Sequence, residues 1–336
     1  MKKLISVIAL VFVMTIVCAV GAYADTGTAT VGGVAYSSLN DAISNAQSVD
    51  TIVLSAGTFT ATNLSGTQNK SITISGAGRD VTFLDMAQNQ YVENAVNGAS
   101  LAFENLTINE DDNIYNGLTH AVSITYSNCK IDGQIFNWSP AGISFNNCEF
   151  VQDNPNAYNV WTYAATNISF TNCSFVCAGK SVLVYNENGA GTTATFDVCS
   201  FQATQTVSGK AAIEIDSSLL GDPKRFTVRI SSSQATGFDS NSVCGNQLWN
   251  EKTLSEKTTV YVNNEIKYPF SQVPADPKPD APVNPAPAPA APAAPVVENV
   301  YCVPGTADHS EMALWGVMAM LLTGTAFFTR KRKTEN

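Results

Sequence analysis

The chain has few of the residue types from which most metal and catalytic sites are built. Its 336 residues include only two histidines, His120 and His309, and charged residues make up 14% of the total. No Cys-x-x-Cys pair occurs, although there are eight cysteines. Structural zinc sites are typically made of closely spaced Cys and His residues. We therefore expect no metal site and no required cofactor.

Basic residues are also scarce. The chain holds 18 Lys and Arg against 28 Asp and Glu; leaving out six basic and three acidic residues at its two ends, residues 25–306 hold 12 and 25, a net charge of −13. Nucleic-acid binding requires a basic patch, and this part of the sequence has no basic cluster, so nucleic acid is excluded as a partner. An acidic exterior also disfavours acidic polysaccharides unless calcium intervenes.

Long apolar runs are confined to the two ends of the chain. Lys2 and Lys3 are followed by a mostly apolar run from Leu4 to Val20 and then by Ala22-Tyr-Ala24. This order is typical of a cleaved secretory signal. Residues 1–24 are therefore predicted to be a signal peptide, and the protein is predicted to be extracellular.

Between these ends, one short phrase is repeated. It alternates apolar with small polar residues, usually reaches Asn-Cys, and ends on a further apolar residue. Its copies begin at Ile124, Ile143, Ile168 and Ala194, and a fifth, which begins at Leu101, has Leu in place of Cys. The cysteine-equivalent positions recur about every 23 residues on average, a period typical of stacked repeats.

The alternation within the phrase predicts a strand with one buried face, so that Phe145 faces inward and Ser144 outward. The alternation breaks at the Asn, where we expect a tight corner in the left-handed backbone conformation. The corner side chains would then stack and hydrogen-bond along the repeat, satisfying buried amides. These residues are Asn105, Asn128, Asn147 and Asn172.

The cysteines of the phrase would face inward after the corner. Eight cysteines in a secreted chain also suit a disulfide framework. However, equivalent positions of adjacent parallel strands lie about 4.8 Å apart, wider than the usual Cβ separation of a disulfide. We therefore expect a column of buried thiols, formed by Cys129, Cys148, Cys173 and Cys199.

With two strands and a corner per repeat, the phrase resembles the coils of the right-handed parallel β-helix of the pectin-lyase-like superfamily. An amphipathic segment over residues 36–46, followed by Asp50-Thr-Ile-Val-Leu54, is similar to the capping helix and first coil of that superfamily. The resemblance implies an all-β fold over residues 25–270, a right-handed parallel β-helix of about ten coils with a short N-terminal capping helix. We expect it to be a monomer.

The C-terminal part has a different composition. Nine prolines occur between Pro274 and Pro295, so residues 271–300 are predicted to be a disordered Pro/Ala-rich linker that acts as a semi-rigid stalk. Residues 301–336 then contain Val303-Pro304-Gly-Thr306-Ala307, the apolar run from Met312 to Phe328 and a basic tail.

This order resembles the cell-wall sorting signal of Gram-positive surface proteins, in which Leu-Pro-x-Thr-Gly precedes a hydrophobic stretch and a basic tail. Val303 replaces the Leu, and Ala307 replaces the Gly. The resemblance implies that a sortase cuts after Thr306 and joins the protein to peptidoglycan or to a pilus. The alternative is a single-pass membrane anchor with the N-terminal domain outside.

The superfamily includes polysaccharide lyases and hydrolases, but the Gly-His-Gly that the resemblance associates with its hydrolases does not occur. The densest acidic cluster is Glu110, Asp111 and Asp112, which could act as a carboxylate pair or hold calcium. Three consecutive acids after a strand also suit a solvated loop, and this interpretation is the favoured one. No catalytic residue is assigned.

Aromatic residues are the stronger functional candidates. Trp138, Tyr158, Trp161 and Tyr163 lie in two adjacent coils where the phrase is interrupted, and exposed rings stack on sugar faces. Trp161 or Tyr163 could instead point into the core, because alternation allows either. The leading hypothesis is a wall-anchored, non-enzymatic adhesin or carbohydrate-binding module with a glycan or host-surface ligand. The alternatives are a wall-attached polysaccharide lyase or glycoside hydrolase, and a structural spacer or minor pilus subunit.

Overall fold

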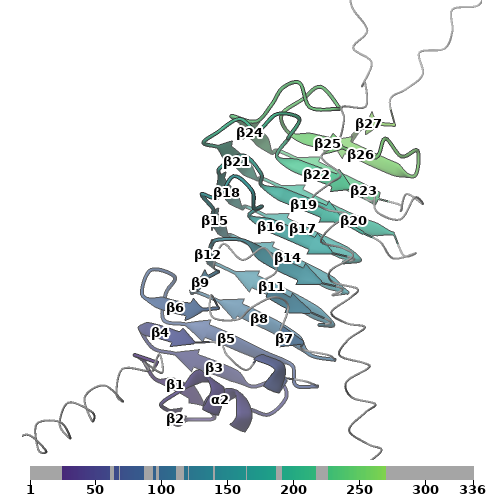
Figure 1. Ribbon diagram of the computed structural model, residues 1–336. Coiled ribbons are helices and arrows are strands. Elements are labelled where there is room, and N and C mark those ends of the chain that lie inside the picture. Colours follow the sequence, from purple (N-terminus) through teal and green to yellow (C-terminus); the bar gives the residue numbers. More distant parts are fainter. Residues whose placement is uncertain are drawn as a thin grey trace, which may run out of the picture.

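The computed structural model describes residues 25–60, 64–67, 69–86, 94–95, 98–110, 117–119, 121–138, 141–163, 165–186, 191–216 and 226–269 (Figure 1). The predicted signal peptide, linker and sorting signal lie outside these residues, as do Asp111, Asp112 and His120. Within the described part, no helix is both long and apolar enough to cross a membrane.

The described chain winds through three β-sheets in turn. One sheet has twelve strands, in the order β2 (Val34–Tyr36), β1 (Ala29–Val31), β3 (Thr51–Leu54), β5 (Ile72–Gly76), β8 (Ser100–Glu104), β11 (Ser123–Ser127), β14 (Gly142–Asn146), β17 (Asn167–Thr171), β20 (Thr192–Asp197), β23 (Phe226–Ser231), β26 (Thr258–Val262) and β27 (Glu265–Tyr268). We call it the twelve-stranded sheet.

The other two sheets are entirely parallel. The eight-stranded sheet contains β4 (Gly57–Thr60), β6 (Thr82–Asp85), β9 (Thr107–Asn109), β12 (Lys130–Asp132), β15 (Glu149–Val151), β18 (Ser174–Cys177), β21 (Ser200–Ala203) and β24 (Gln234–Thr236). The seven-stranded sheet contains β7 (Asn94–Ala95), β10 (Gly117–Thr119), β13 (Ile135–Trp138), β16 (Val160–Tyr163), β19 (Val182–Tyr185), β22 (Ile213–Asp216) and β25 (Trp249–Glu251).

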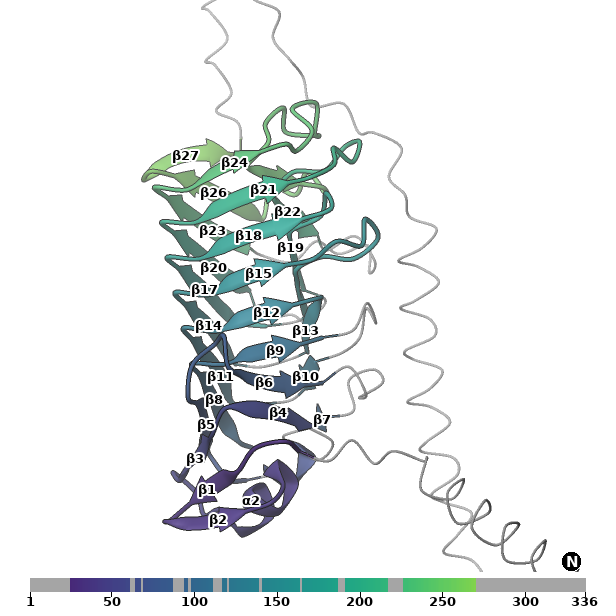
Figure 2. The same cartoon turned by 90° about the vertical axis from the view of Figure 1, so that its left-hand side faces the viewer.

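Each turn of the chain from β5 to β25 adds one strand to each sheet, and each strand pairs in parallel with its equivalent in the next turn. Figure 2 shows these coils stacked along one axis. This arrangement is a parallel β-helix, which confirms the predicted all-β class.

The interior is filled by like residues stacked on like. The aromatic residues of the phrase form one column, with ring centroids 4.6 Å apart between Tyr126 and Phe145 and 4.9 Å between Phe145 and Phe170. In the eight-stranded sheet, Phe150 stacks on Phe175 at 4.4 Å. All of these rings are buried, so the predicted inward parity is confirmed.

The four corner asparagines have left-handed backbone φ angles of 53–56°, as predicted. Each later amide donates to the Oδ1 of the one before it, over 2.8 Å from Asn128 to Asn105, 3.1 Å from Asn147 to Asn128 and 3.0 Å from Asn172 to Asn147. Asn105 and Asn128 are half-buried and the other two are exposed, so the prediction of buried amides was wrong. The corner turns outward, because a left-handed residue between two strands projects its side chain away from the core.

The predicted thiol column is present. Cys129, Cys148, Cys173 and Cys199 are buried and free. The sulfur of Cys148 donates to the carbonyl of Tyr126 in the previous coil at 3.5 Å, and the other three make equivalent contacts. Cysteine therefore fills a small apolar space and supplies a weak donor to a neighbouring carbonyl.

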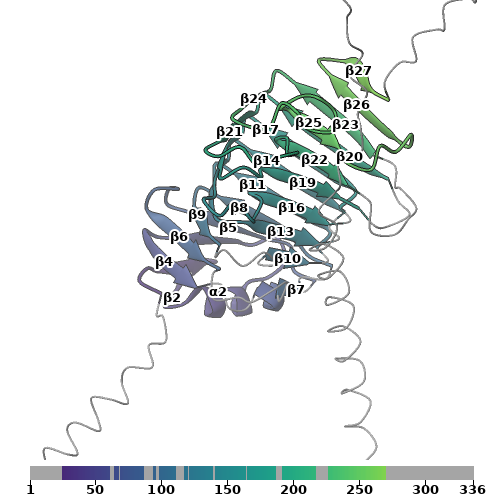
Figure 3. The same cartoon turned by 45° about the horizontal axis from the view of Figure 1, so that its top comes forward.

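The two ends of the twelve-stranded sheet differ from its middle. At the N-terminal end, β1 pairs antiparallel with β2 and β3, and at the other end β27 pairs antiparallel with β26. Helix α2 (Leu39–Asn45) packs beside β1, β2 and the 3-10 helix η1 (Leu64–Thr67), at the end of the solenoid seen in Figure 3. The helix is shorter than predicted because Tyr36 belongs to β2 and Ser38 is the N-cap, accepting from the Asp41 amide at 3.1 Å.

Candidate functional site

The outer face of the seven-stranded sheet carries most of the candidate residues. Val160 and Thr162 of β16 are fully buried, whereas Trp161 and Tyr163 are only partly buried. Because neighbouring residues of a strand point to opposite faces, both rings face outward. The structure thus decides between the two orientations that the sequence leaves open.

Parallel pairing aligns these rings with side chains of adjacent coils. Tyr163 is in register with Trp138 on one side and with Tyr185 on the other. The ring centroids are 5.6 Å apart between Trp138 and Tyr163, nearly perpendicular, and 5.1 Å apart between Tyr163 and Tyr185. Trp161 meets Phe136 edge-to-face at 5.1 Å. We call these five residues the aromatic face.

Tyr158 also belongs to this region, but it does not present a free ring. It lies in the loop between β15 and β16, is only 8% exposed, and packs with Leu183 and Tyr185. Its backbone amide donates to the Gln134 side chain at 2.6 Å, and Lys180 Nζ lies 5.8 Å from the ring centroid. The expectation of an exposed sugar-stacking ring was wrong for Tyr158, because its loop folds back onto the sheet.

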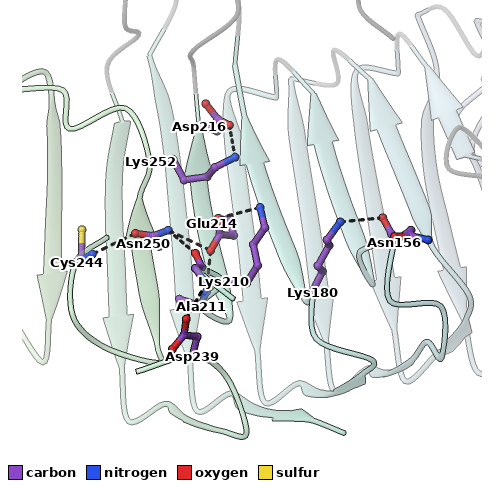
Figure 4. A network of polar contacts seen from close by, with 11 residues as sticks. Asn156, Lys180, Lys210, Ala211, Glu214, Asp216, Asp239, Cys244, Asn250 and Lys252 are labelled. Atoms are coloured by element: carbon purple, nitrogen blue, oxygen red, sulfur yellow. Dashed lines mark hydrogen bonds and ion pairs between the residues drawn. The ribbon is translucent and has the colours of Figure 1, made fainter. Parts of the chain in front are cut away.

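In the coil after β19, acidic residues occupy the outward positions of the seven-stranded sheet. Leu183 is in register with Glu214, and Tyr185 with Asp216. Lys252 Nζ lies 2.8 Å from Asp216 Oδ2, and Lys210 Nζ lies 3.8 Å from Glu214 Oε2 (Figure 4). These four residues form what we call the acid–lysine cluster.

Further hydrogen bonds hold Glu214 in place. Its Oε1 accepts from the Ala211 backbone amide at 2.8 Å and from Asn250 Nδ2 at 3.3 Å. Burial raises the pKa of Glu214, and the two lysines oppose that rise. Burial also raises the pKa of Tyr158, with Glu214 as the next cause, so the acid–lysine cluster also acts on the tyrosine that packs against Tyr185.

Sequence reasoning missed the acid–lysine cluster. Its signal was Ile213-Glu-Ile-Asp216, in which acids alternate with core residues in one strand of the repeat. Such an alternation places both carboxylates on one face, with Cα atoms about 6.6 Å apart.

Glu110 lies away from this face and points into the solenoid. It is 7% exposed, and neither carboxylate oxygen has a hydrogen-bond partner among the residues that the structure describes. Burial, and then the neighbouring Asp85, raises the pKa of Glu110 well above its usual value. The solvated-loop prediction was therefore wrong for Glu110, because the inward phase of β9 continues one residue past the end of the strand.

The other surfaces offer less chemistry. A shallow hollow of about 330 Å³ on the twelve-stranded sheet is lined by Ser, Thr, Ile, Gly and Asn residues, with no charged or aromatic residue. The described residues include no group of three or more His, Cys, Asp or Glu side chains placed to hold a metal.

Comparisons of the chain with protein-family models, with curated proteins and with solved structures found no match.

Proposed function

We propose that this protein binds glycans through the aromatic face, as a non-enzymatic module displayed outside the cell. The observation that supports this proposal is the row of outward rings on consecutive coils, Trp138, Tyr163 and Tyr185, of which the first two are partly exposed. Aromatic faces stack on the apolar faces of sugars, and the coils repeat them about every 4.8 Å.

The scaffold suits this role. The rings are held by parallel strands and by each other, so little side-chain freedom remains to be lost on binding. In the acid–lysine cluster beside them, Glu214 and Asp216 are buried, but the partly exposed Lys210 and Lys252 supply donors that can orient a polyhydroxylated ligand. A rigid face with apolar platforms and a polar end is the usual composition of a small-molecule or oligosaccharide site.

Display outside the cell is proposed from the sequence. The signal peptide, the proline-rich linker and the sorting signal around Thr306 support attachment to peptidoglycan or a pilus by a sortase. Mass spectrometry of wall digests is expected to find a C-terminal peptide that ends at Thr306 and is linked to a wall or pilus amine. Wall-associated protein that retains the residues beyond Thr306 would instead indicate the single-pass membrane anchor.

The binding proposal is tested with a glycan array and the variant Trp138→Ala. We expect binding to fall at least tenfold, because one stacking platform is lost. Tyr261→Ala is the matched control, since Tyr261 is a partly buried aromatic on the twelve-stranded sheet. Equal binding by both variants, with unchanged melting temperatures, would contradict the proposal.

A second candidate function is polysaccharide cleavage at the acid–lysine cluster. The supporting observation is that Glu214 and Asp216 share the face that carries the aromatic rings, and a raised pKa suits a general acid. If the protein is an enzyme, neutral or acidic polysaccharides will yield new reducing ends or unsaturated uronates, and Glu214→Gln will abolish them. No product with the wild type would leave Glu214 and Asp216 as structural ion-pair partners.

A further inference from the structure

The interior aromatic column changes at one coil. Its members are Phe103, Phe145, Phe170 and Phe196, with Tyr126 as the exception. The Tyr126 hydroxyl is fully buried and donates to Asn137 Oδ1 at 3.4 Å. Asn137 is an inward residue of β13, in the same coil, and is itself fully buried. One coil therefore carries two polar side chains directed into the core.

A second change in this coil lies at the corner between β12 and β13. Backbone hydrogen bonds from Glu110 to Asp132 and from Gly133 to Val151 put Glu110, Gly133 and Gln152 at equivalent positions of three successive coils. Gly133 cannot carry a side chain, because its φ is 104° and a Cβ would overlap the Glu110 carbonyl. No side chain therefore separates Glu110 from Gln152 at this position.

Several buried polar atoms of these three coils have no partner within the described part of the chain. They are both carboxylate oxygens of Glu110, Oε1 of Gln152 and Nδ2 of Asn137. Glu110 is 7% exposed, Gln152 4% and Asn137 0%. Glu110 is also the first charged group to raise the pKa of Tyr126, after burial.

Unpartnered buried polar atoms are rare and destabilising. Three of the four atoms here are oxygens, and one of the three side chains is a carboxylate. Which atom of the Asn137 amide is oxygen and which is nitrogen is assigned from the hydrogen-bond network. With the two exchanged, the unpartnered atom becomes a fourth oxygen, and the nitrogen can donate to the Tyr126 hydroxyl. Carboxylate and amide oxygens are the ligands that hard cations prefer.

We propose that the coil β11–β12–β13 encloses a site for a hard, oxygen-ligated cation, held by the Glu110 carboxylate and the amide oxygens of Gln152 and Asn137 beside Tyr126. The site is separate from the aromatic face and does not depend on the proposed glycan binding. A monovalent ion such as Na⁺ or K⁺ would neutralise the single carboxylate. A divalent ion such as Ca²⁺ would bring further oxygen ligands, which water could supply.

The test measures the melting temperature of the full chain after treatment with a chelator and dialysis into a buffer free of metal ions. NaCl, KCl or CaCl₂ is then added at constant ionic strength, with a tetramethylammonium salt as balance. At a concentration about 100 times Kd, the cation that binds is expected to raise the melting temperature by about 5–10 °C. Comparison of the three salts identifies the charge and size of the ion.

Two variants at the site and one control outside it connect the effect to this site. Glu110→Gln should lose the cation-dependent rise, whereas Glu104→Gln, in the same coil but outward and half-buried, should keep it. Gln152→Met, which removes an oxygen but preserves side-chain length, should weaken binding at least tenfold. It keeps the test decisive if Glu110→Gln changes folding.

Terbium gives an independent signal, because it replaces hard cations and is excited by a nearby phenol. Terbium emission excited through tyrosine should appear with the wild type and be lost in Tyr126→Phe, which should still show the cation-dependent rise in melting temperature. If no cation raises the melting temperature, or if Glu110→Gln responds as the wild type does, the proposal is overturned. A gain in stability of Glu110→Gln without any cation effect would indicate internal water in place of an ion.

Discussion

The carboxyl group of Glu110, inside the solenoid, makes stability depend on pH. Glu110 is buried, and its folded-state pKa lies well above its usual value, so folding disfavours the charged form. The free-energy cost of burying the charged carboxylate is absent below the pKa of Glu110 in the unfolded chain, near 4.5. This cost grows as pH rises toward the pKa of Glu110 in the folded protein.

In a buffer free of metal ions, Glu110→Gln is therefore expected to be more stable than the wild type at pH 8, by about 1–3 kcal/mol. The two proteins should be nearly equal at pH 4. Urea unfolding at both pH values measures the difference. A gain that is the same at pH 4 and pH 8 would show that packing, and not ionisation, causes it.

Thiol reactivity should separate the cysteines by burial. Cys129, Cys148, Cys173, Cys177 and Cys199 are buried, whereas Cys244 is half-buried. Burial raises the pKa of Cys177 to about 11, and contacts between neighbouring thiols, with burial, raise the pKa of Cys148 and Cys173 to about 12. Little thiolate, the reactive form, is then present at these three positions at pH 8. Contact with Cys148 lowers the pKa of Cys129, so this sulfur is protected by its burial alone.

Alkylation of the native protein at pH 8, followed by peptide mapping, should therefore label Cys244 before these five, which should react only after unfolding. Labelled Cys148 in the folded protein, or a disulfide between successive coils, would contradict the expected column of thiols.

At the scale of elements, the corner between two strands combines a backbone and a side-chain requirement. Asn147 has a φ of 54°, donates to Asn128 and accepts from Asn172. Asn147→Ala should lower the free energy of unfolding by about 2–3 kcal/mol, since it loses two hydrogen bonds and strains a left-handed residue. Asn147→Gly should cost less, because glycine adopts this conformation without strain. Denaturant unfolding of both variants separates the hydrogen-bond contribution from the backbone strain. Equal losses of unfolding free energy would mean that the hydrogen bonds alone matter.

The elements also show why some features could be predicted and others could not. The corner at Asn128 and the inward position of Cys129 are local properties of the repeated phrase, so they were predicted correctly. The orientation of Trp161 was not determined, because a strand with apolar residues on both faces, such as Val160-Trp161, fits either parity. Asp216 was missed because its ion pair with Lys252 depends on register between coils, which no local pattern encodes.

Glu110 shows another limit of local reasoning. Three consecutive acids suggested solvent exposure, yet the strand phase carries the first of them inward. The reason lies in the next coil, where Gly133 permits close approach of the two backbones. A contact between residues 23 positions apart could not be inferred from either segment alone.

For the whole molecule, the antiparallel strand pairs at the two ends of the twelve-stranded sheet decide whether the solenoid remains monomeric. The middle strands of the twelve-stranded sheet have partners on both sides, but β26 is covered on one side only by β27. An uncovered, regular strand edge pairs readily with another chain. The hairpin of β26 and β27 therefore protects the edge of the twelve-stranded sheet from pairing with another chain.

Ending the chain after Asn263 removes β27 and leaves the outer edge of β26 uncovered. We expect this shortened protein to self-associate at micromolar concentrations, while a chain that ends after Pro269 remains monomeric. Light scattering coupled to size-exclusion chromatography measures the masses of both. Because β27 also contributes Tyr268, whose ring lies 6.2 Å from Trp249, a third chain that keeps β27 but carries Tyr268→Ala separates loss of the core contact from loss of the edge cover. Self-association of this third chain to the same extent would assign the effect to packing, whereas a monomer would assign it to the strand edge.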